Sequence, residues 1–105
     1  MVMATDKLQT ANLPNNMGTS VNLASYTSTF YTFPTDGYVM VNAGTTSTAK
    51  AIVRIYPANE STNISMGGWN TGNYPSWTTF VRKGMKAKVA TLENQGTIYF
   101  YPLIY

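Results

Sequence analysis

Cysteine and histidine are both absent from this chain of 105 residues. Without cysteine, the fold can form no disulfide and can offer no thiol nucleophile. Without histidine, it lacks the usual general base at neutral pH and the commonest side-chain ligand for transition metals. No cluster of other ligand types replaces them, so we expect no metal site and no bound cofactor.

Charged side chains are also scarce, with seven basic and four acidic residues and a formal net charge of +3. A glycosidase needs two carboxylates that flank one bond. Asp36 belongs to a turn, and nothing in the sequence places Glu60 beside Glu93. We therefore expect a protein that is not an enzyme.

Long apolar runs are missing as well. The longest run covers residues 98–105, whereas a helix that spans a bilayer needs about 20 apolar residues. No apolar run follows Met1, so we expect neither a secretory signal nor insertion into a membrane.

Thr, Ser, Asn and aromatic residues are abundant, and the aromatics make up 13% of the chain. This composition is typical of a folded β protein. Residues 1–19 are polar and interrupted by Pro14 and Gly18, which predicts an N-terminal arm or linker with a short helix over residues 5–13. Residues 20–105 are expected to form a single domain.

Short apolar stretches separated by turn residues predict strands over residues 38–41, 51–56, 78–81, 85–89 and 97–105. The long irregular stretch 58–76 is either functional or contains an edge strand around Ile64–Met66. No segment of the body keeps a helical period. Strands of this length and spacing predict an all-β fold, either an antiparallel jelly roll or a β-sandwich.

The segment Phe33–Val41 is the strongest local signal. Pro34 holds Phe33 in an extended conformation. Asp36 can bond to its own backbone, and Gly37 can adopt a positive φ without steric cost. The segment therefore predicts a tight turn that leads into a buried strand.

The last predicted strand has two apolar faces. Ile98, Phe100 and Ile104 share one face, and the other face carries Tyr99, Tyr101, Leu103 and Tyr105. One interpretation is a central strand that the chain itself covers on both sides. We favour the other, in which the tyrosine face lies in a homo-oligomer interface, because tyrosine combines apolar area with a polar tip.

The segment from Gly67 to Trp77 is the best candidate for a ligand site. Aromatic faces stack on sugar rings, and neighbouring amides bond to hydroxyls. The candidate residues are Trp69, Asn70, Asn73, Tyr74 and Trp77. The alternative is that the tryptophans cap the core; Trp77, which shares a predicted strand with Phe80, suits that role better than Trp69.

Four of the seven cations, Arg82, Lys83, Lys86 and Lys88, fall in one short segment. They could contact phosphate or anionic glycans. We favour a solvated strand face whose lysines discourage aggregation, and we expect no binding to nucleic acid, because such binders usually carry interleaved stacking aromatics.

Three short motifs together resemble the small β domains of phage tail fibres and related virion attachment proteins. They are Pro-Thr-Asp-Gly at 34–37, Phe-Val-Arg-Lys-Gly at 80–84 and Tyr-Pro-Leu at 101–103. The resemblance covers residues 30–105 and marks a fold more than an activity.

The resemblance implies a trimeric jelly roll of the tumour-necrosis-factor type, in which an aromatic C-terminal strand lines the threefold axis. Tyr99, Tyr101 and Tyr105 would occupy that axis. It further implies a virion protein that is assembled in the host cytoplasm with other virion proteins. Its expected role is receptor binding at a tail-fibre tip, through a carbohydrate of the host surface. The alternative is a capsid decoration, assembly or trimerisation protein without a ligand of its own.

Overall fold

The computed structural model describes residues 18–44, 48–69 and 76–104, with Trp69 described by its backbone alone. Within these ranges the chain forms eight β-strands and no helix. The strands are β1 (Val21–Asn22), β2 (Tyr31–Thr32), β3 (Gly37–Asn42), β4 (Lys50–Tyr56), β5 (Ile64–Trp69), β6 (Ser76–Val81), β7 (Lys86–Glu93) and β8 (Thr97–Pro102). The helix predicted over residues 5–13 and most of the predicted arm lie outside the described residues.

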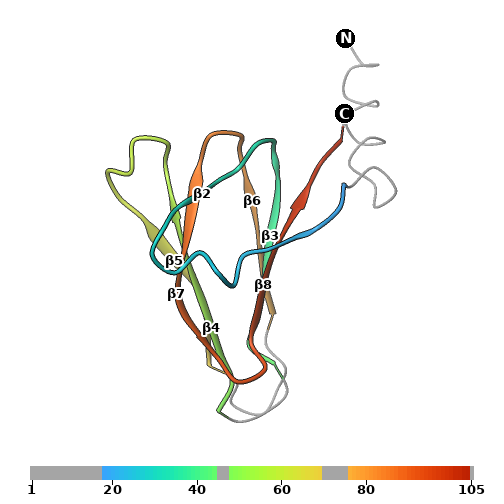
Figure 1. Cartoon of the computed structure of the whole chain (residues 1–105), viewed down its shortest axis with the longest axis vertical. Coiled ribbons are helices and arrows are strands. Elements are labelled where there is room, and N and C mark those ends of the chain that lie inside the picture. The colour runs from blue at the N-terminus through green and yellow to red at the C-terminus, as the bar shows by residue number, and fades with distance from the viewer. Residues whose placement is uncertain (1–17, 45–47, 70–75, 105) are drawn as a thin grey trace.

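The strands form two antiparallel four-stranded sheets that pack face to face (Figure 1). One sheet, here called the β8 sheet, has the order β1-β8-β3-β6, and the other, the β7 sheet, has the order β2-β7-β4-β5. The first strand pairs with the last, the second with the seventh, the third with the sixth and the fourth with the fifth. One long antiparallel hairpin wrapped around a core produces this pairing, which is the jelly-roll arrangement. The predicted all-β fold is confirmed.

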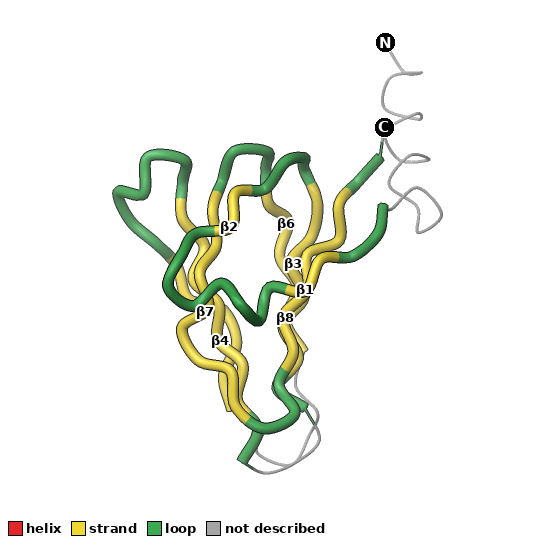
Figure 2. The backbone as a smooth tube through the Cα atoms, in the orientation of Figure 1, coloured by secondary structure: helices red, strands yellow, loops and turns green. Residues whose placement is uncertain are grey.

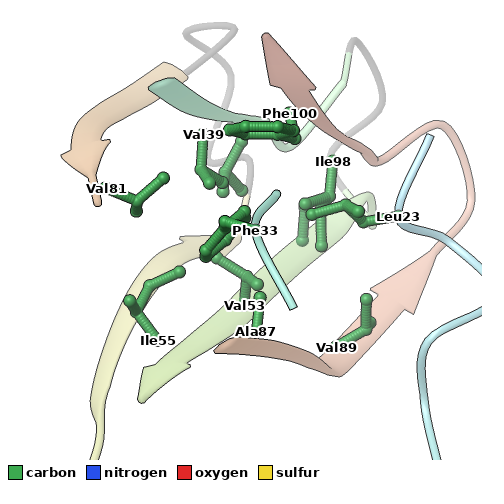
Figure 3. Close-up of a cluster of buried hydrophobic side chains, with 12 residues drawn as sticks. Leu23, Phe33, Val39, Val53, Ile55, Val81, Ala87, Val89, Ile98 and Phe100 are labelled. Atoms are coloured by element: carbon green, nitrogen blue, oxygen red, sulfur yellow. The ribbon is translucent and has the colours of Figure 1, made fainter. Parts of the chain in front are cut away.

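Apolar side chains from both sheets fill the space between them (Figure 3). The predicted alternation is confirmed in β3 and β4, where Val39, Val41, Val53 and Ile55 are buried. The ring of Phe33 connects the layers and lies 4.8 Å from that of Phe100, between centroids. Burial of each such side chain stabilises the fold by about 1.5–3 kcal/mol, so this core is the main source of stability.

The edge strand, one of the two alternatives for residues 58–76, is present as β5, which pairs with β4 and forms the edge of the β7 sheet within the described residues. Gly67 permits the close approach of these two strands. Its φ is +116°, and a Cβ atom there would lie 2.1 Å from the carbonyl oxygen of Ala51. Glycine is therefore required at this position, both because φ is positive and because the Ala51 carbonyl leaves no space for a Cβ atom.

The turn before β3 differs from its prediction. Gly37 does not have the positive φ that the Asp-Gly pair predicts; glycine is needed here for space, because a Cβ would lie 2.4 Å from the carbonyl oxygen of Tyr101 and 2.6 Å from the ring of Phe100. The Asp36 carboxylate accepts a hydrogen bond from the N–H of Lys83, and the Asp36 carbonyl accepts one from the N–H of Leu103. Asp36 thus ties its own turn to two distant segments.

The last strand is also shorter than predicted and ends at Pro102. The prediction that Leu103 lies on the tyrosine face is wrong, since this side chain is 2% exposed, and Ile104, predicted on the core face, is 56% exposed. Proline fixes φ near −65°, far from the value of an antiparallel strand. The alternation of side chains therefore slips by one residue at Pro102.

Strand direction divides the connections between two ends of the sandwich (Figure 2). The turns between β2 and β3, β4 and β5, and β6 and β7 lie at one end. Gly18 is at this end too, where its N–H donates to the carbonyl of Pro102. Because neighbouring strands are antiparallel, β3, β5 and β7 all finish at the opposite end.

Candidate functional site

The outer side of the β8 sheet carries a cluster of apolar side chains, which we call the aromatic face. Its members are Tyr38, Met40, Phe80, Tyr99 and Tyr101. The register places Met40 opposite Tyr99 and places Tyr38 between Tyr101 and Phe80. Three neighbouring strands, β8, β3 and β6, thus build one continuous surface.

Contacts between rings order this face. Tyr38 and Phe80 pack edge to face with 5.5 Å between ring centroids, and Tyr99 and Tyr101 lie 6.3 Å apart. Met40 is 38% exposed and Phe80 is 43% exposed. The solvated side of an antiparallel sheet is normally polar, and no helix within the described ranges covers this one. An exposed apolar patch of this kind marks an interaction surface.

The aromatic face overlaps the predicted interface only in part. Tyr99 and Tyr101 belong to it, Leu103 is buried within the subunit, and Tyr105 lies outside the described residues. The sequence analysis did not assign Met40 and Phe80 to an interface. The signal was present in their alternation with the buried Val39, Val41 and Val81, but only the strand order brings them beside β8.

Three of the five predicted ligand residues, Asn70, Asn73 and Tyr74, lie outside the described residues. Trp69 ends β5, where its backbone pairs with that of Lys50. Trp77, at the start of β6, is half-buried and packs against the core.

Trp77 reaches across to the other sheet. A Cβ atom on Gly68 would be in ordinary contact with its indole, 3.6 Å from Cη2. This position agrees with the alternative interpretation of Trp77 as a cap of the core. Trp77 therefore covers the core at the end of the sandwich where β5 ends and β6 begins.

The four clustered cations divide into two groups. Arg82 and Lys83 are exposed in the turn between β6 and β7. Lys86 and Lys88 lie on the outer side of the β7 sheet, where Arg54 of β4 pairs in register with Lys88. Arg54 was not part of the predicted cluster, because the pairing of β4 with β7 cannot be read from local sequence.

Two aromatic rings accompany these cations. The Nζ atom of Lys88 lies 4.2 Å from the centroid of the Phe30 ring, and that of Lys86 lies 5.6 Å from it. Tyr56 packs edge to face against Phe30, with 4.8 Å between centroids and an interplanar angle of 85°. The stacking aromatics that the sequence analysis found lacking near this cluster are therefore supplied by residues distant in sequence.

Glu60, in the turn after β4, and Glu93, the last residue of β7, form salt bridges at opposite ends of β4. Glu60 pairs with Lys86, which is in register with Tyr56, and Glu93 pairs with Lys50 at 3.1 Å. Six residue steps of about 3.3 Å separate those ends. This distance, about 20 Å, is at least twice the separation of about 5–9.5 Å between glycosidase carboxylates.

Comparison with known proteins gives no relative: no family model, no curated protein and no solved structure matches this chain. Within the described ranges, no three acidic residues come together as a metal site would require. The same ranges contain no helix with the length and hydropathy to span a membrane.

Proposed function

We propose that this chain is a structural protein of a phage virion, which assembles as a homotrimer through the aromatic face and acts in attachment to the host surface. The observation that supports the assembly is the aromatic face itself. Tyrosine, phenylalanine and methionine are enriched at protein interfaces. A soluble sandwich that presents Met40 and Phe80 to water gains stability when a second copy covers them.

The resemblance of the three motifs to tail-fibre domains supports the virion role and the number of subunits. In the structure the motifs meet in space. Asp36 of the first receives hydrogen bonds from Lys83 of the second and Leu103 of the third. The motifs therefore form one structural unit, and β8, which ends in the third motif, also carries Tyr99 and Tyr101 of the aromatic face.

The position of the loop between β5 and β6 supports a role in attachment. Its flanking residues, Trp69 and Ser76, lie at the end of the sandwich opposite to Gly18 (Figure 1). A subunit held in a larger particle near Gly18 would present this loop outward. Trp69 and the neighbouring amides would then contact a host carbohydrate.

The mass of the purified protein tests the assembly. By light scattering at micromolar concentration, we expect three times the chain mass of 11.5 kDa. Phe80→Ser should shift the protein towards the monomer, since Phe80 is 43% exposed and contributes to the aromatic face rather than to the core. Ile64→Ser is a matched control, because Ile64 is 63% exposed on the edge of the other sheet and should leave the mass unchanged. A monomeric wild-type protein would remove the proposal of a trimer.

Glycan binding tests the attachment role separately. We expect a host glycan to bind the wild-type protein and Trp69→Ala to reduce both this binding and the adsorption to host cells. An absence of binding at millimolar glycan, together with unchanged adsorption of Trp69→Ala, would count against a carbohydrate receptor.

A second candidate is a capsid decoration or assembly protein without a ligand. The packing of Trp77 against the core favours it, because this tryptophan then needs no external partner. In this case Tyr101→Ala would lower the stability of the oligomer and its incorporation into virions, whereas changes in the loop would be silent. Labelling the protein on intact phage particles shows whether it lies on the head or on the tail, and this location distinguishes the two functions.

A further inference from the structure

The outer side of the β7 sheet, on the opposite layer from the aromatic face, carries cations around a pair of rings. We call this surface the cation–ring platform. It consists of Phe30, Arg54, Tyr56, Lys86 and Lys88. Phe30 precedes β2, Arg54 and Tyr56 belong to β4, and the two lysines belong to β7 between them.

The rings hold the lysine side chains in place. Phe30 is half-buried and fixed by its edge-to-face contact with Tyr56. The ammonium group of Lys88 lies 4.2 Å from the centroid of that ring, within the distance at which a cation and an aromatic face attract each other. An ordered ammonium group loses less conformational freedom when it binds an anion.

The charges on the platform are only partly compensated. Lys86 pairs with Glu60, and the other salt bridge of the described chain, between Lys50 and Glu93, lies at the far end of β4. Arg54 stands directly opposite Lys88 in the antiparallel register, and like charges in that position destabilise a sheet. An anion held between Arg54 and Lys88 would remove this repulsion.

We propose that the cation–ring platform binds the acidic group of an anionic polysaccharide, a carboxylate or a phosphate on a sugar. The anion lies between Arg54 and Lys88, which donate charge-assisted hydrogen bonds to it. Ser65 is exposed and in register with Arg54, so its hydroxyl, together with that of Tyr56, is placed to bond to sugar hydroxyls.

A saccharide fits this surface better than a nucleic acid does. Binding to single strands relies on open aromatic faces on which bases stack and on a groove of cations along the backbone. Here the Phe30 ring is already approached by both lysine ammonium groups. Among the three platform cations, Arg54 and Lys88 have no salt bridge within the described residues. Two such cations are enough to bind one acidic group but not a run of phosphates.

The proposal is independent of the trimer and of the loop between β5 and β6, because the platform lies on the other sheet from the aromatic face and near the Tyr56 end of β4, whereas Trp69 pairs with Lys50 at the opposite end. A failure of either proposal would therefore leave the other untouched.

Titration of the full chain with polygalacturonate, at low salt, tests the proposal. We expect binding that weakens as salt is added and that neutral dextran does not reproduce. Arg54→Gln and Lys88→Gln should each raise the dissociation constant about tenfold, the equivalent of one charge-assisted hydrogen bond. Arg82→Gln and Lys83→Gln are the matched controls, because they remove the same charges from the exposed turn between β6 and β7 and should leave binding unchanged.

A second measurement separates loss of binding from loss of folding. Thermal melts of Arg54→Gln should show no decrease in melting temperature, since this change relieves a repulsion between like charges. The proposal is overturned by an absence of binding, or by an equal loss of affinity in Arg82→Gln. It is likewise overturned if single-stranded DNA of matched charge binds more tightly than polygalacturonate.

Discussion

The carboxylate of Asp36 accepts a hydrogen bond of 2.8 Å from the backbone N–H of Lys83, although the two residues are 47 positions apart. The carbonyl of Asp36 also receives the N–H of Leu103. One residue thus connects the turn before β3, the turn after β6 and the segment that follows β8. The separate turn motifs of the sequence are consequently parts of a single junction.

Asp36→Ala should lower the free energy of unfolding by about 0.5–1.5 kcal/mol, because it removes the exposed hydrogen bond that the Asp36 carboxylate accepts from the N–H of Lys83. Asp36→Asn keeps an oxygen at the same place and should recover much of this loss. Urea denaturation measures both variants. Equal damage by the two changes would show that the negative charge, rather than the acceptor, stabilises the junction.

Gly37→Ala should be strongly destabilising. The added methyl would meet the carbonyl oxygen of Tyr101 at 2.4 Å and the ring of Phe100 at 2.6 Å; overpacking of this kind costs about 1–3 kcal/mol or more. Gly68→Ala is the matched control, since its methyl would find only the Trp77 indole at 3.6 Å. Melting temperatures of the two variants check the prediction, which fails if they fall by the same amount.

The stability of the protein should decrease at alkaline pH because of Tyr31. Burial raises the pKa of its phenol above the usual 10.0, and the neighbouring Tyr26 adds to this shift. As far as Tyr31 is concerned, the folded protein therefore keeps its full stability below about pH 10. It loses stability as the pH rises through the higher pKa that Tyr31 has in the folded state. Thermal melts between neutral and alkaline pH should show a shallower decrease for Tyr31→Phe than for the wild type.

The melting temperature should depend on protein concentration if copies associate through the aromatic face, because association stabilises the folded state by mass action. Met40→Ser should abolish this dependence. Met40 is 38% exposed and faces away from the core, so the change should leave the melting temperature at high dilution close to that of the wild type. A wild-type melting temperature that is constant over a wide range of concentration would contradict the prediction.

Most of the fold can be predicted from the alternation of apolar and polar residues along each strand. The faces of β3 and β4 follow from the period of two in Val39, Val41, Val53 and Ile55, and the edge strand β5 follows from the improbable length of the stretch 58–76. Such signals depend on neighbours along the chain. They are reliable wherever one side of a strand is buried.

The errors concern relationships between distant segments. Gly37 looks like a turn glycine until Tyr101 and Phe100 are placed against it. The alternation of residues 97–105 predicts that Leu103 lies on the same face as Tyr99 and Tyr101. In the structure, β8 ends at Pro102 and the side chain of Leu103 is buried. Likewise, Arg54 joins Lys88, and Phe80 joins Tyr38, only through strand pairs that no local pattern specifies. Both candidate surfaces consequently gained members that the sequence alone could not assign.

The hydrogen bond between Gly18 and Pro102 has a practical consequence for protein engineering. Two backbone points at the margins of the sandwich are already in contact, so the domain can be grafted into a surface loop of an unrelated host protein without stretching either junction. The same proximity permits a circularly permuted version, closed by a linker near Gly18 and reopened in the turn between β4 and β5.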